Sequence, residues 1–375
     1  MQYDAAIIGG GLAGLCLAIQ FAENNYNVIL FEKEEYPFQK VCGEYISLES
    51  WNFLQRLGVK LNELNLPIIK KLKVSDVDGT VYTFNLPLGG FGISRFYLDN
   101  ILYQIAVAKG VTVCTNTKVN NVEFIKDAFI VTTADKAVSA KVAAGAFGKR
   151  SNLDIKWHRP FTMQKANTLN NYIGIKYHIN YTHKPDEIYL HNFYKGYCGL
   201  SKIEEDKSCL CYLTTAENLR NCGNSIQEMQ KQILCKNPRL KEIFDAADFL
   251  YEQPLAISQI SFNKKQQVEN HVLMLGDAAG MISPLCGNGM SMAMHASTLA
   301  FAKMHQFLTN TISRNQMEEG YASAWNKEFS NRLLVGRNVQ RFFGGNRSAS
   351  IFIKSMHFFP ALAKIVIQST HGKPF

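Results

Sequence analysis

No two cysteines in this sequence of 375 residues have the C-x-x-C spacing, although the chain contains nine cysteines. They are scattered over positions 16, 42, 114, 198, 209, 211, 222, 235 and 286. An odd, scattered set argues against a disulfide framework, and the missing C-x-x-C pair argues against a zinc site. We therefore expect no bound metal and a reducing compartment, the cytoplasm.

Long apolar runs are also missing from the sequence. No uninterrupted apolar stretch reaches the roughly 18 residues that a bilayer-spanning helix needs, so we expect no membrane span. The first residues, MQYDAAIIGGG, carry Asp4 and no basic residue. They predict a buried strand entering a turn and not a signal peptide. Apolar residues make up 47% of the chain and charged residues 19%, which is typical of a globular protein.

Acidic residues are scarce near the C-terminal end. Positions 325–375 hold eight Lys and Arg residues against one acid, Glu328, and this accounts for +7 of the net charge of +9. No recognised binding motif accompanies this charge, so we expect no nucleic-acid partner. The stretch SIFIKSMHFFPALAKIVIQ mixes apolar residues with Lys354, His357 and Lys364. It predicts a helix pair packed on its own domain, a peripheral surface for anionic lipid, or a wall for a long-chain substrate.

The N-terminal segment YDAAIIGGGLAGLCLAIQFAENNYNVILFEKE contains a strand, a glycine-rich turn, a helix and a second strand. The glycines of the turn have the spacing G-x-G-x-x-G, and an acid, Glu32, follows the second strand. This order is typical of a dinucleotide-binding unit, in which the pyrophosphate lies at the positive end of the helix.

Each glycine of this turn has its own physical task. Gly9 permits the tight turn, Gly11 lets backbone amides approach a pyrophosphate, and Gly14 lets the helix pack closely on the strand. Glu32 is placed to accept hydrogen bonds from an adenosine ribose. The cofactor-binding residues predicted in this unit are Gly9, Gly11, Leu12, Ala13, Gly14, Glu32 and Lys33.

A second segment of this kind, HVLMLGDAAGMISPLCGNGM, begins some 260 residues later in the chain. An expected strand over 271–275 ends in Gly276-Asp277, and small residues follow. A single carboxylate among residues with almost no side chain predicts a shelf for a large, flat ligand. A capped strand–turn–helix with a purely structural role is the alternative.

Together the N-terminal glycine turn and the late GDAAG…P…G-x-G-M pattern resemble the flavoproteins of the para-hydroxybenzoate hydroxylase fold. Within them the sequence looks most like the branch of geranylgeranyl reductases and flavin-dependent halogenases. The resemblance covers most of the chain in motif order and implies FAD as the cofactor. In that family the late Asp, here Asp277, binds a ribityl hydroxyl. Pro284 would lie beside the isoalloxazine ring, and the following helix would direct its amides at the N1–C2 edge. The residues predicted to bind the cofactor here are Asp277, Pro284, Gly287, Asn288, Gly289 and Met290.

The resemblance extends to three shorter patterns. Arg95 begins the family's Arg-x-x-x-Asp-x-x-Leu pattern, whose Arg contacts the cofactor, although a surface arginine is the alternative. Val119 occupies the position at which the family often reads adenine. In the stretch PFQKVCGE, Lys40 is expected at the phosphates. Cys42 and Glu44 are the candidates for the flavin face, Glu44 as a general acid.

Two family features are absent. The family's Gly-Ala-Asp-Gly-x-x-Ser stretch reads GAFGKRS here, with Phe147 in place of the Asp that is implicated in nicotinamide-cofactor use. This puts direct reduction by NAD(P)H in doubt, and it favours a separate flavin or electron-donating reductase as a partner. The halogenases' W-x-W-x-I-P stretch is also missing, so we do not expect halogenation.

The resemblance and the periodicity predict an α/β protein, α+β overall. A Rossmann-type FAD-binding domain would carry an inserted β-sheet substrate domain and a helical C-terminus. We expect the C-terminal helices to be divided at Gly344-Gly345 and at Pro360. The expected ranges are 1–70, 95–155 and 265–310 for the FAD-binding domain, 71–94 and 156–264 for the substrate domain, and 311–375 for the helical segment.

Three functions are compatible with this reading. We favour a flavin monooxygenase, in which a flavin C4a-hydroperoxide hydroxylates or epoxidises an apolar aromatic, polyketide or isoprenoid substrate. The alternative is a reductase of isolated double bonds that resembles geranylgeranyl reductase, with a protein acid as proton donor. A flavoprotein that only carries electrons is the third reading. In each case the cofactor does the redox chemistry, and the protein supplies orientation and exclusion of water.

Overall fold

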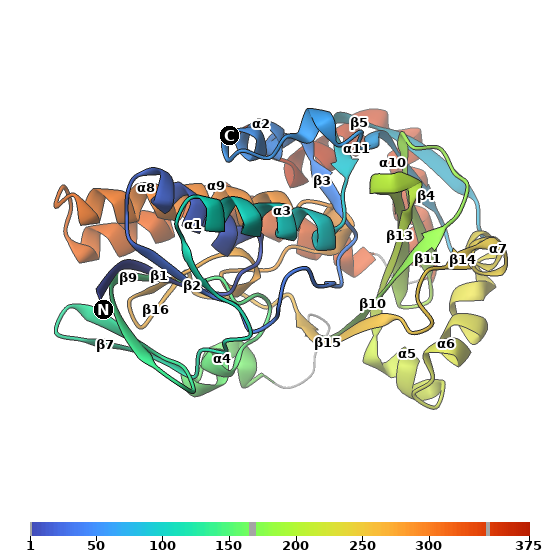
Figure 1. The fold of residues 1–375 in the computed structure, drawn as a ribbon. Coiled ribbons are helices and arrows are strands. Elements are labelled where there is room, and N and C mark those ends of the chain that lie inside the picture. Colours follow the sequence, from blue (N-terminus) through green and yellow to red (C-terminus); the bar gives the residue numbers. More distant parts are fainter. Residues whose placement is uncertain (1, 165–169, 343–345) are drawn as a thin grey trace.

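The computed structural model describes residues 2–164, 170–342 and 346–375 (Figure 1). It contains two β-sheets, helices that cover both of them, and a helical C-terminal segment. This confirms the predicted α/β fold class. The predicted break at Gly344-Gly345 lies outside the described residues.

The first sheet is built around the N-terminal strand β1, which is apolar and buried on both faces from Ala5 to Ile8. β1 pairs in parallel with β2 and β9, β6 adds in parallel beyond β2, and β17 adds in parallel beyond β9. Because parallel strands end at one edge, the turns that follow β1, β2, β9 and β17 meet there. The strands of this sheet are β1 Gln2–Ile8, β2 Val28–Phe31, β6 Thr112–Cys114, β7 Asn121–Ile125, β8 Ala128–Thr132, β9 Ala137–Gly145, β16 Val268–Glu269 and β17 Val272–Met274.

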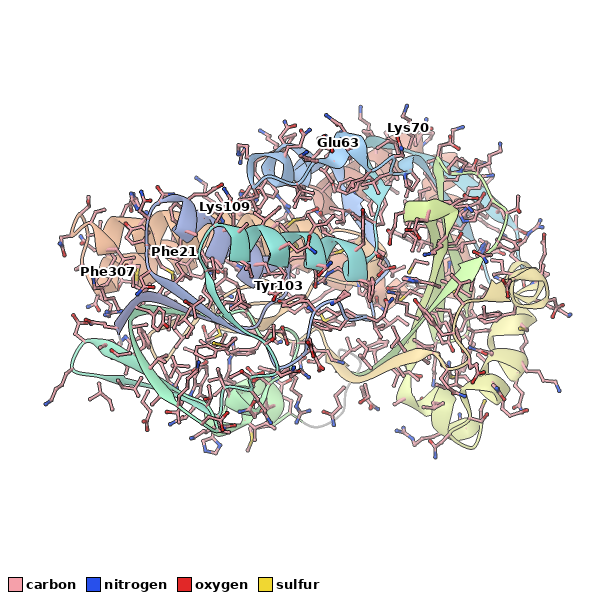
Figure 2. The ribbon with its side chains drawn as sticks, viewed as in Figure 1. Phe21, Glu63, Lys70, Tyr103, Lys109 and Phe307 are labelled. Carbon is pink, nitrogen blue, oxygen red and sulfur yellow. The ribbon has the colours of Figure 1, made fainter. Side chains whose placement is uncertain are left out.

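Four helices lie together over one face of this sheet (Figure 1). The central one, α1, is buried over most of its length, because it is enclosed by the sheet and by its neighbours. Phe21 of α1, labelled in Figure 2, packs edge-on against Phe301 of α8 with 5.2 Å between ring centroids. The four helices are α1 Leu12–Glu23, α3 Arg95–Ala108, α8 Gly289–Leu308 and α9 Arg314–Phe342.

The second sheet is mainly antiparallel, and the structure places it beside the carboxyl edge of the first (Figure 1). One pairing, β4 with β11, is parallel and joins segments that are far apart in the chain. The strands of this sheet are β3 Tyr45–Ser47, β4 Ile68–Ser75, β5 Val81–Gly92, β10 Asn170–Asn180, β11 Glu187–Phe193, β12 Gly196–Lys202, β13 Ser208–Thr215, β14 Asp248–Phe249 and β15 Leu255–Ser261.

Helices cover both faces of the second sheet. One face packs on α5–α7, and the other packs on α10 and α11, so the side chains of its strands alternate between two apolar layers. The remaining helices are α2 Trp51–Arg56, α4 Asn152–Lys156, α5 Ala216–Asn221, α6 Ile226–Gln232, α7 Pro238–Ala246, α10 Asn346–Phe358 and α11 Pro360–Thr370.

The boundary at residue 70 does not coincide with a change of sheet. β3 lies inside the expected range 1–70 but pairs with β5 in the second sheet, and β4 begins at Ile68. Pairing with a distant strand sets these positions, and local periodicity carries no sign of it. The division of the chain into domains stays a proposal.

Within the described residues, no single helix is long and apolar enough to cross a bilayer. The segments Ala349–Phe358 and Pro360–Thr370 reach that length and composition only together, and they meet at an angle of 111°. The bend falls at Pro360, where the sequence predicted a division, because proline cannot continue the preceding helix.

His191 of β11 makes the stability of this sheet depend on pH. The side chain is buried, its Nδ1 lies 2.9 Å from Ser75 Oγ, and burial together with Arg239 lowers its pKa to about 4. The unfolded chain therefore takes up a proton near pH 6.5, while the folded chain does not. We expect the free energy of unfolding to fall by about 2 kcal/mol between pH 7.5 and pH 5 because of this residue.

Urea unfolding at a series of pH values checks this expectation. The His191→Asn variant keeps a polar atom near Ser75 but does not titrate in this range, so its free energy of unfolding should lose less on acidification. Parallel pH profiles of the two proteins would contradict the assignment.

Candidate functional site

A cavity of about 250 Å³ lies where the carboxyl edge of the first sheet meets the second sheet. Its wall combines the N-terminal glycine turn, the loop before β3, the start of α3 and the segment after β17. The two sequence segments some 260 residues apart are thus brought together. The predicted site residues in this wall are Gly11, Leu12, Ala13, Cys42, Glu44, Arg95, Asp277, Pro284, Gly287, Asn288, Gly289 and Met290.

The three glycines of the N-terminal turn are in different surroundings. Gly9 has a φ of +105°, and a Cβ there would lie 2.4 Å from the carbonyl oxygen of Ala146. A Cβ on Gly14 would lie 2.0 Å from the carbonyl oxygen of Gly9, so these two glycines are required by the packing of the turn itself. A Cβ on Gly11 would meet nothing closer than 3.7 Å. The space above Gly11 is therefore open, as close approach of a pyrophosphate requires.

Two cations border this open space. The side-chain nitrogens Lys40 Nζ and Arg95 Nη2 each lie 3.7 Å from the Cβ position of Gly11. The buried carboxylate of Asp99 holds both of them, Arg95 through two bonds of 2.7 Å and Lys40 through one of 2.9 Å. Two cations and one carboxylate leave a net positive charge beside the first turn of α1, which suits a phosphate.

Glu32 directly follows β2 at the same edge of the sheet. It is buried, and its two carboxylate oxygens accept hydrogen bonds from the amides of Gly10 at 2.9 Å and Glu34 at 3.1 Å. These bonds fix the carboxylate beside the glycine turn and leave lone pairs for ribose hydroxyls. The neighbouring Lys33 is exposed and pairs with Glu34 at 3.2 Å, so its side chain lies away from the cavity wall.

The late segment places Asp277 in a short 3₁₀ turn directly after β17. Its carboxylate borders the cavity and has no hydrogen-bond or ion-pair partner among the described residues. Burial raises the pKa of this carboxyl, although Lys265, Arg95 and Lys149 partly offset the shift. A carboxylate without a partner in such a wall is suited to bind sugar hydroxyls, as predicted for the ribityl chain.

Helix α8 begins at the cavity, as the sequence predicted for the shelf. Gly287, with a φ of +62°, turns the chain into the helix, and Asn288 is its N-cap residue. The Asn288 side chain donates to the carbonyl of Thr370 at 2.7 Å, so it links the shelf to the end of α11. Asn288 makes no side-chain capping bond to α8, so the amides of the first turn of α8 can face a ligand in the cavity.

Cys42 and Glu44 both lie in the wall of the cavity, but neither has the protonation state that a reactive thiolate or a general acid needs. The Cys42 sulfur lies 3.6 Å from that of Met290, and burial raises the pKa of the Cys42 thiol. This setting suits a lining role and not a thiolate.

The carboxylate of Glu44 is fully buried and bound by the ammonium group of Lys176, the ring of His178 and a backbone amide. Lys176 donates to one oxygen, His178 Nε2 lies 2.6 Å from the other, and the amide of Arg95 donates at 2.9 Å. These partners hold the pKa of Glu44 below its ordinary value although burial opposes them. An ionised carboxylate has no proton to give, so this geometry argues against the predicted general-acid role.

Sequence reasoning missed Lys176 and His178. Both lie on β10 and point to the same side as Gly174, which lines the cavity. Lys176 also donates to the carbonyl of Lys40 at 3.2 Å, so it ties the loop between β2 and β3 to the second sheet. The available signal was the alternation of a Lys and a His within an otherwise aromatic and aliphatic strand.

Two further positions lie outside the cavity wall. Val119 is buried, and its carbonyl accepts a hydrogen bond of 3.1 Å from Asn152, so its role at adenine stays a prediction. Phe147, which occupies the position of the family's Asp, packs against Trp157 with 6.3 Å between ring centroids. Apart from Glu44 and Asp277, the described wall holds no carboxylate that could replace this Asp.

Fold and cavity together define an FAD-dependent oxidoreductase. The chain belongs to the FAD binding domain family, which matches residues 2–323. The open space above Gly11, its two cations, and the unpaired carboxylate of Asp277 fit the pyrophosphate and sugar of FAD.

Curated relatives are distant but similar over most of the chain. The chain is 22% identical to conditioned medium factor receptor 1 of Dictyostelium discoideum, over 91% of this chain and 70% of the relative. It is 24% identical to digeranylgeranylglycerophospholipid reductase 1 of Methanothermobacter thermautotrophicus, over 80% of this chain and 76% of the relative.

Solved structures share the fold over nearly the whole chain. The flavin-dependent brominase Bmp2 superposes with a TM-score of 0.81 at 18% identity, covering 99% of this chain and 93% of the brominase. The probable FAD-dependent monooxygenase PqsL of Pseudomonas aeruginosa superposes with a TM-score of 0.72 at 15% identity, covering 94% and 100%. At such identities these likenesses establish the fold and not the reaction.

Proposed function

We propose that the protein is a flavin monooxygenase that inserts one oxygen atom of O₂ into an apolar substrate. The supporting observation is that the described wall of the cavity holds no carboxylic acid that is free to donate a proton. The carboxyl groups in its described wall are Glu44 and Asp277. Glu44 is ionised and held by Lys176 and His178, and Asp277 belongs to the predicted ribityl site. Hydride transfer to an isolated double bond needs a proton donor at carbon, whereas oxygen insertion needs a cavity that excludes water.

The chain's own residues would hold the cofactor in this reaction. Glu32 would bind the ribose, the amides above Gly11 with Lys40 and Arg95 would bind the pyrophosphate, and Asp277 would bind the ribityl chain. When bound and reduced, FAD supplies the electrons that activate oxygen. The second oxygen atom takes up two protons and leaves as water.

The substrate that fits the wall is apolar with one polar group. The part of the wall contributed by the second sheet is mainly aliphatic, and Gly199 leaves room there because it has no side chain. The hydroxyls of Tyr45 and Tyr197 are buried without a hydrogen-bond partner among the described residues. Since buried polar groups are normally paired, a carbonyl or hydroxyl of the substrate would accept from them.

A separate reductase is the electron donor that we propose. Phe147 packs on Trp157 where the family has an Asp that is implicated in nicotinamide use. The predicted contact with a membrane is a separate proposal, because it depends on the C-terminal helices and not on the flavin site.

Reoxidation of the reduced flavin tests the proposal. The purified protein is loaded with FAD, reduced without oxygen and mixed with aerated buffer while the absorbance spectrum is followed. We expect a transient spectrum that belongs neither to reduced nor to oxidised flavin. Slow and featureless reoxidation would contradict oxygen activation, and a protein that takes up no FAD would overturn the cofactor assignment as well.

The alternative that we retain is a double-bond reductase. It is favoured by the similarity to digeranylgeranylglycerophospholipid reductase 1 and by a second, apolar cavity of about 100 Å³. This second cavity shares Tyr45, Pro284 and Gly287 with the first cavity and continues under α10 and α11. Featureless reoxidation would make this reaction the preferred one, with long unsaturated chains as the substrates to try.

A further inference from the structure

The outer face of α10 and α11 exposes large apolar side chains. Phe358 is 75% exposed and Phe359 is 64% exposed, and both lie at the bend where the two helices meet at 111°. We call the following five residues the bend patch: Ile351, Phe358, Phe359, Leu362 and Ile365.

Packing within the chain does not account for the bend patch. The opposite faces of the same helices supply Ile353, Met356, Ala363 and Ile367, which are buried against the second sheet. The two helices therefore already have an apolar face that the fold covers. A helix that met only water on its other side would carry polar residues there, so an exposed second apolar face indicates an external partner.

The charge around the bend patch identifies the kind of partner. Lys354 of α10 and Lys364 of α11 are exposed, and the sequences of these two helices contain no acidic residue. Aromatic and aliphatic side chains bordered by lysines are suited to the boundary between headgroups and acyl chains of an anionic bilayer. A second copy of this chain would bring the same positive charge to the interface and would be repelled.

The second cavity lies directly behind the bend patch. Phe352, Met356 and Val366 of the same two helices form part of its wall, and it adjoins the first cavity at Tyr45 and Pro284. A membrane bound at the bend patch would therefore lie beside an apolar chamber that continues to the predicted flavin site.

We propose that α10 and α11 form a membrane-docking face that binds anionic lipid surfaces through the bend patch and its lysines. The inference goes beyond the proposed reaction and does not depend on it. Docking brings a bilayer-resident substrate to the second cavity, and the apolar side chains of the bend patch enter the interface without crossing the membrane.

Sedimentation with lipid vesicles tests the proposal on the full FAD-loaded chain. We expect binding to vesicles of phosphatidylcholine with phosphatidylglycerol, weakened by salt, and little binding to phosphatidylcholine alone. The Lys354→Glu/Lys364→Glu variant reverses two charges and should weaken binding by about thirtyfold or more. Phe358→Ser/Phe359→Ser should also weaken it. Because these side chains are exposed, both variants should keep their FAD and their melting temperature.

Control variants carry the same kinds of substitution elsewhere on the surface. Ile155→Ser changes an exposed apolar residue of α4, and Lys231→Glu/Lys236→Glu reverses two exposed charges near α6. Neither should alter vesicle binding beyond the small effect of net charge. The proposal is overturned if the unchanged protein ignores anionic vesicles, or if the controls weaken binding as much as the bend-patch variants.

A second outcome would also overturn the proposal. If the protein dimerises and Phe358→Ser/Phe359→Ser abolishes the dimer without altering vesicle binding, the bend patch is an interface between copies of this chain. Vesicle binding is measured without turnover. Its failure would therefore leave the proposed reaction standing, and failure of oxygen activation would leave docking standing.

Discussion

The Gly11→Ala variant should fold normally and lose most of its affinity for FAD. A Cβ at this position meets no protein atom closer than 3.7 Å, so the free energy of unfolding without cofactor should not fall. The methyl group would occupy the space in which the pyrophosphate approaches the backbone amides. Losing or lengthening those charge-assisted hydrogen bonds should weaken FAD binding by roughly ten- to a hundredfold. Fluorescence titration of the apoprotein with FAD measures the change.

The neighbouring glycine supplies the control for this expectation. Gly14→Ala places a Cβ 2.0 Å from the carbonyl oxygen of Gly9, so it should destabilise the apoprotein itself. One variant should thus affect binding alone, and the other should affect folding. Equal loss of stability in both would show that the space above Gly11 serves packing, and unchanged FAD affinity in Gly11→Ala would rule out this pyrophosphate site.

The second large effect concerns the buried ion pair of Glu44, in the cavity wall, with Lys176. Glu44→Gln removes the charge that compensates Lys176, and neither side chain of that pair has any solvent exposure. A buried charge without its partner typically costs about 3–5 kcal/mol, so urea unfolding at pH 7 should show a loss of that order. His178 would lose its carboxylate partner at the same time.

A double variant shows whether the loss of stability comes from the uncompensated charge or from the changed shape of the site. Glu44→Gln/Lys176→Met removes both charges and should recover much of the lost stability, because an apolar side chain needs no counter-charge. Asp245→Asn, which breaks the exposed pair with Lys241, should cause no measurable change. If Glu44→Gln also causes none, Glu44 is not the ionised partner that the geometry indicates.

The parts of the fold that local patterns encode could be predicted from the sequence. β1, α1 and β2 occur in the predicted order within the N-terminal segment, because the strand–turn–helix unit is specified by glycines and apolar spacing over some thirty residues. The meeting of this unit with Asp277 followed from the family resemblance. Local spacing alone could not have brought together segments so far apart in the chain.

The parts that depend on distant pairing could not be predicted. β3 joins the second sheet through Gly90 and Phe91 of β5, and nothing in its three residues indicates that partner. Glu44 was predicted to be a general acid because the stretch PFQKVCGE resembles a family segment that lies near the flavin. Its chemical state is set by Lys176 and His178, more than 130 residues away.

The parallel order β17–β9–β1 has a consequence for folding during synthesis on the ribosome. The strands of the second sheet all lie between residues 45 and 261, so that sheet can form while synthesis continues. The first sheet must wait, because β17 and α8 leave the ribosome only afterwards. Until then Ala144 and Gly145 at the end of β9 lack their partner strand and α1 lacks the helix that covers it, a state that invites association with other chains. The pocket that receives the cofactor is therefore completed only after β17 and the start of α8 have left the ribosome.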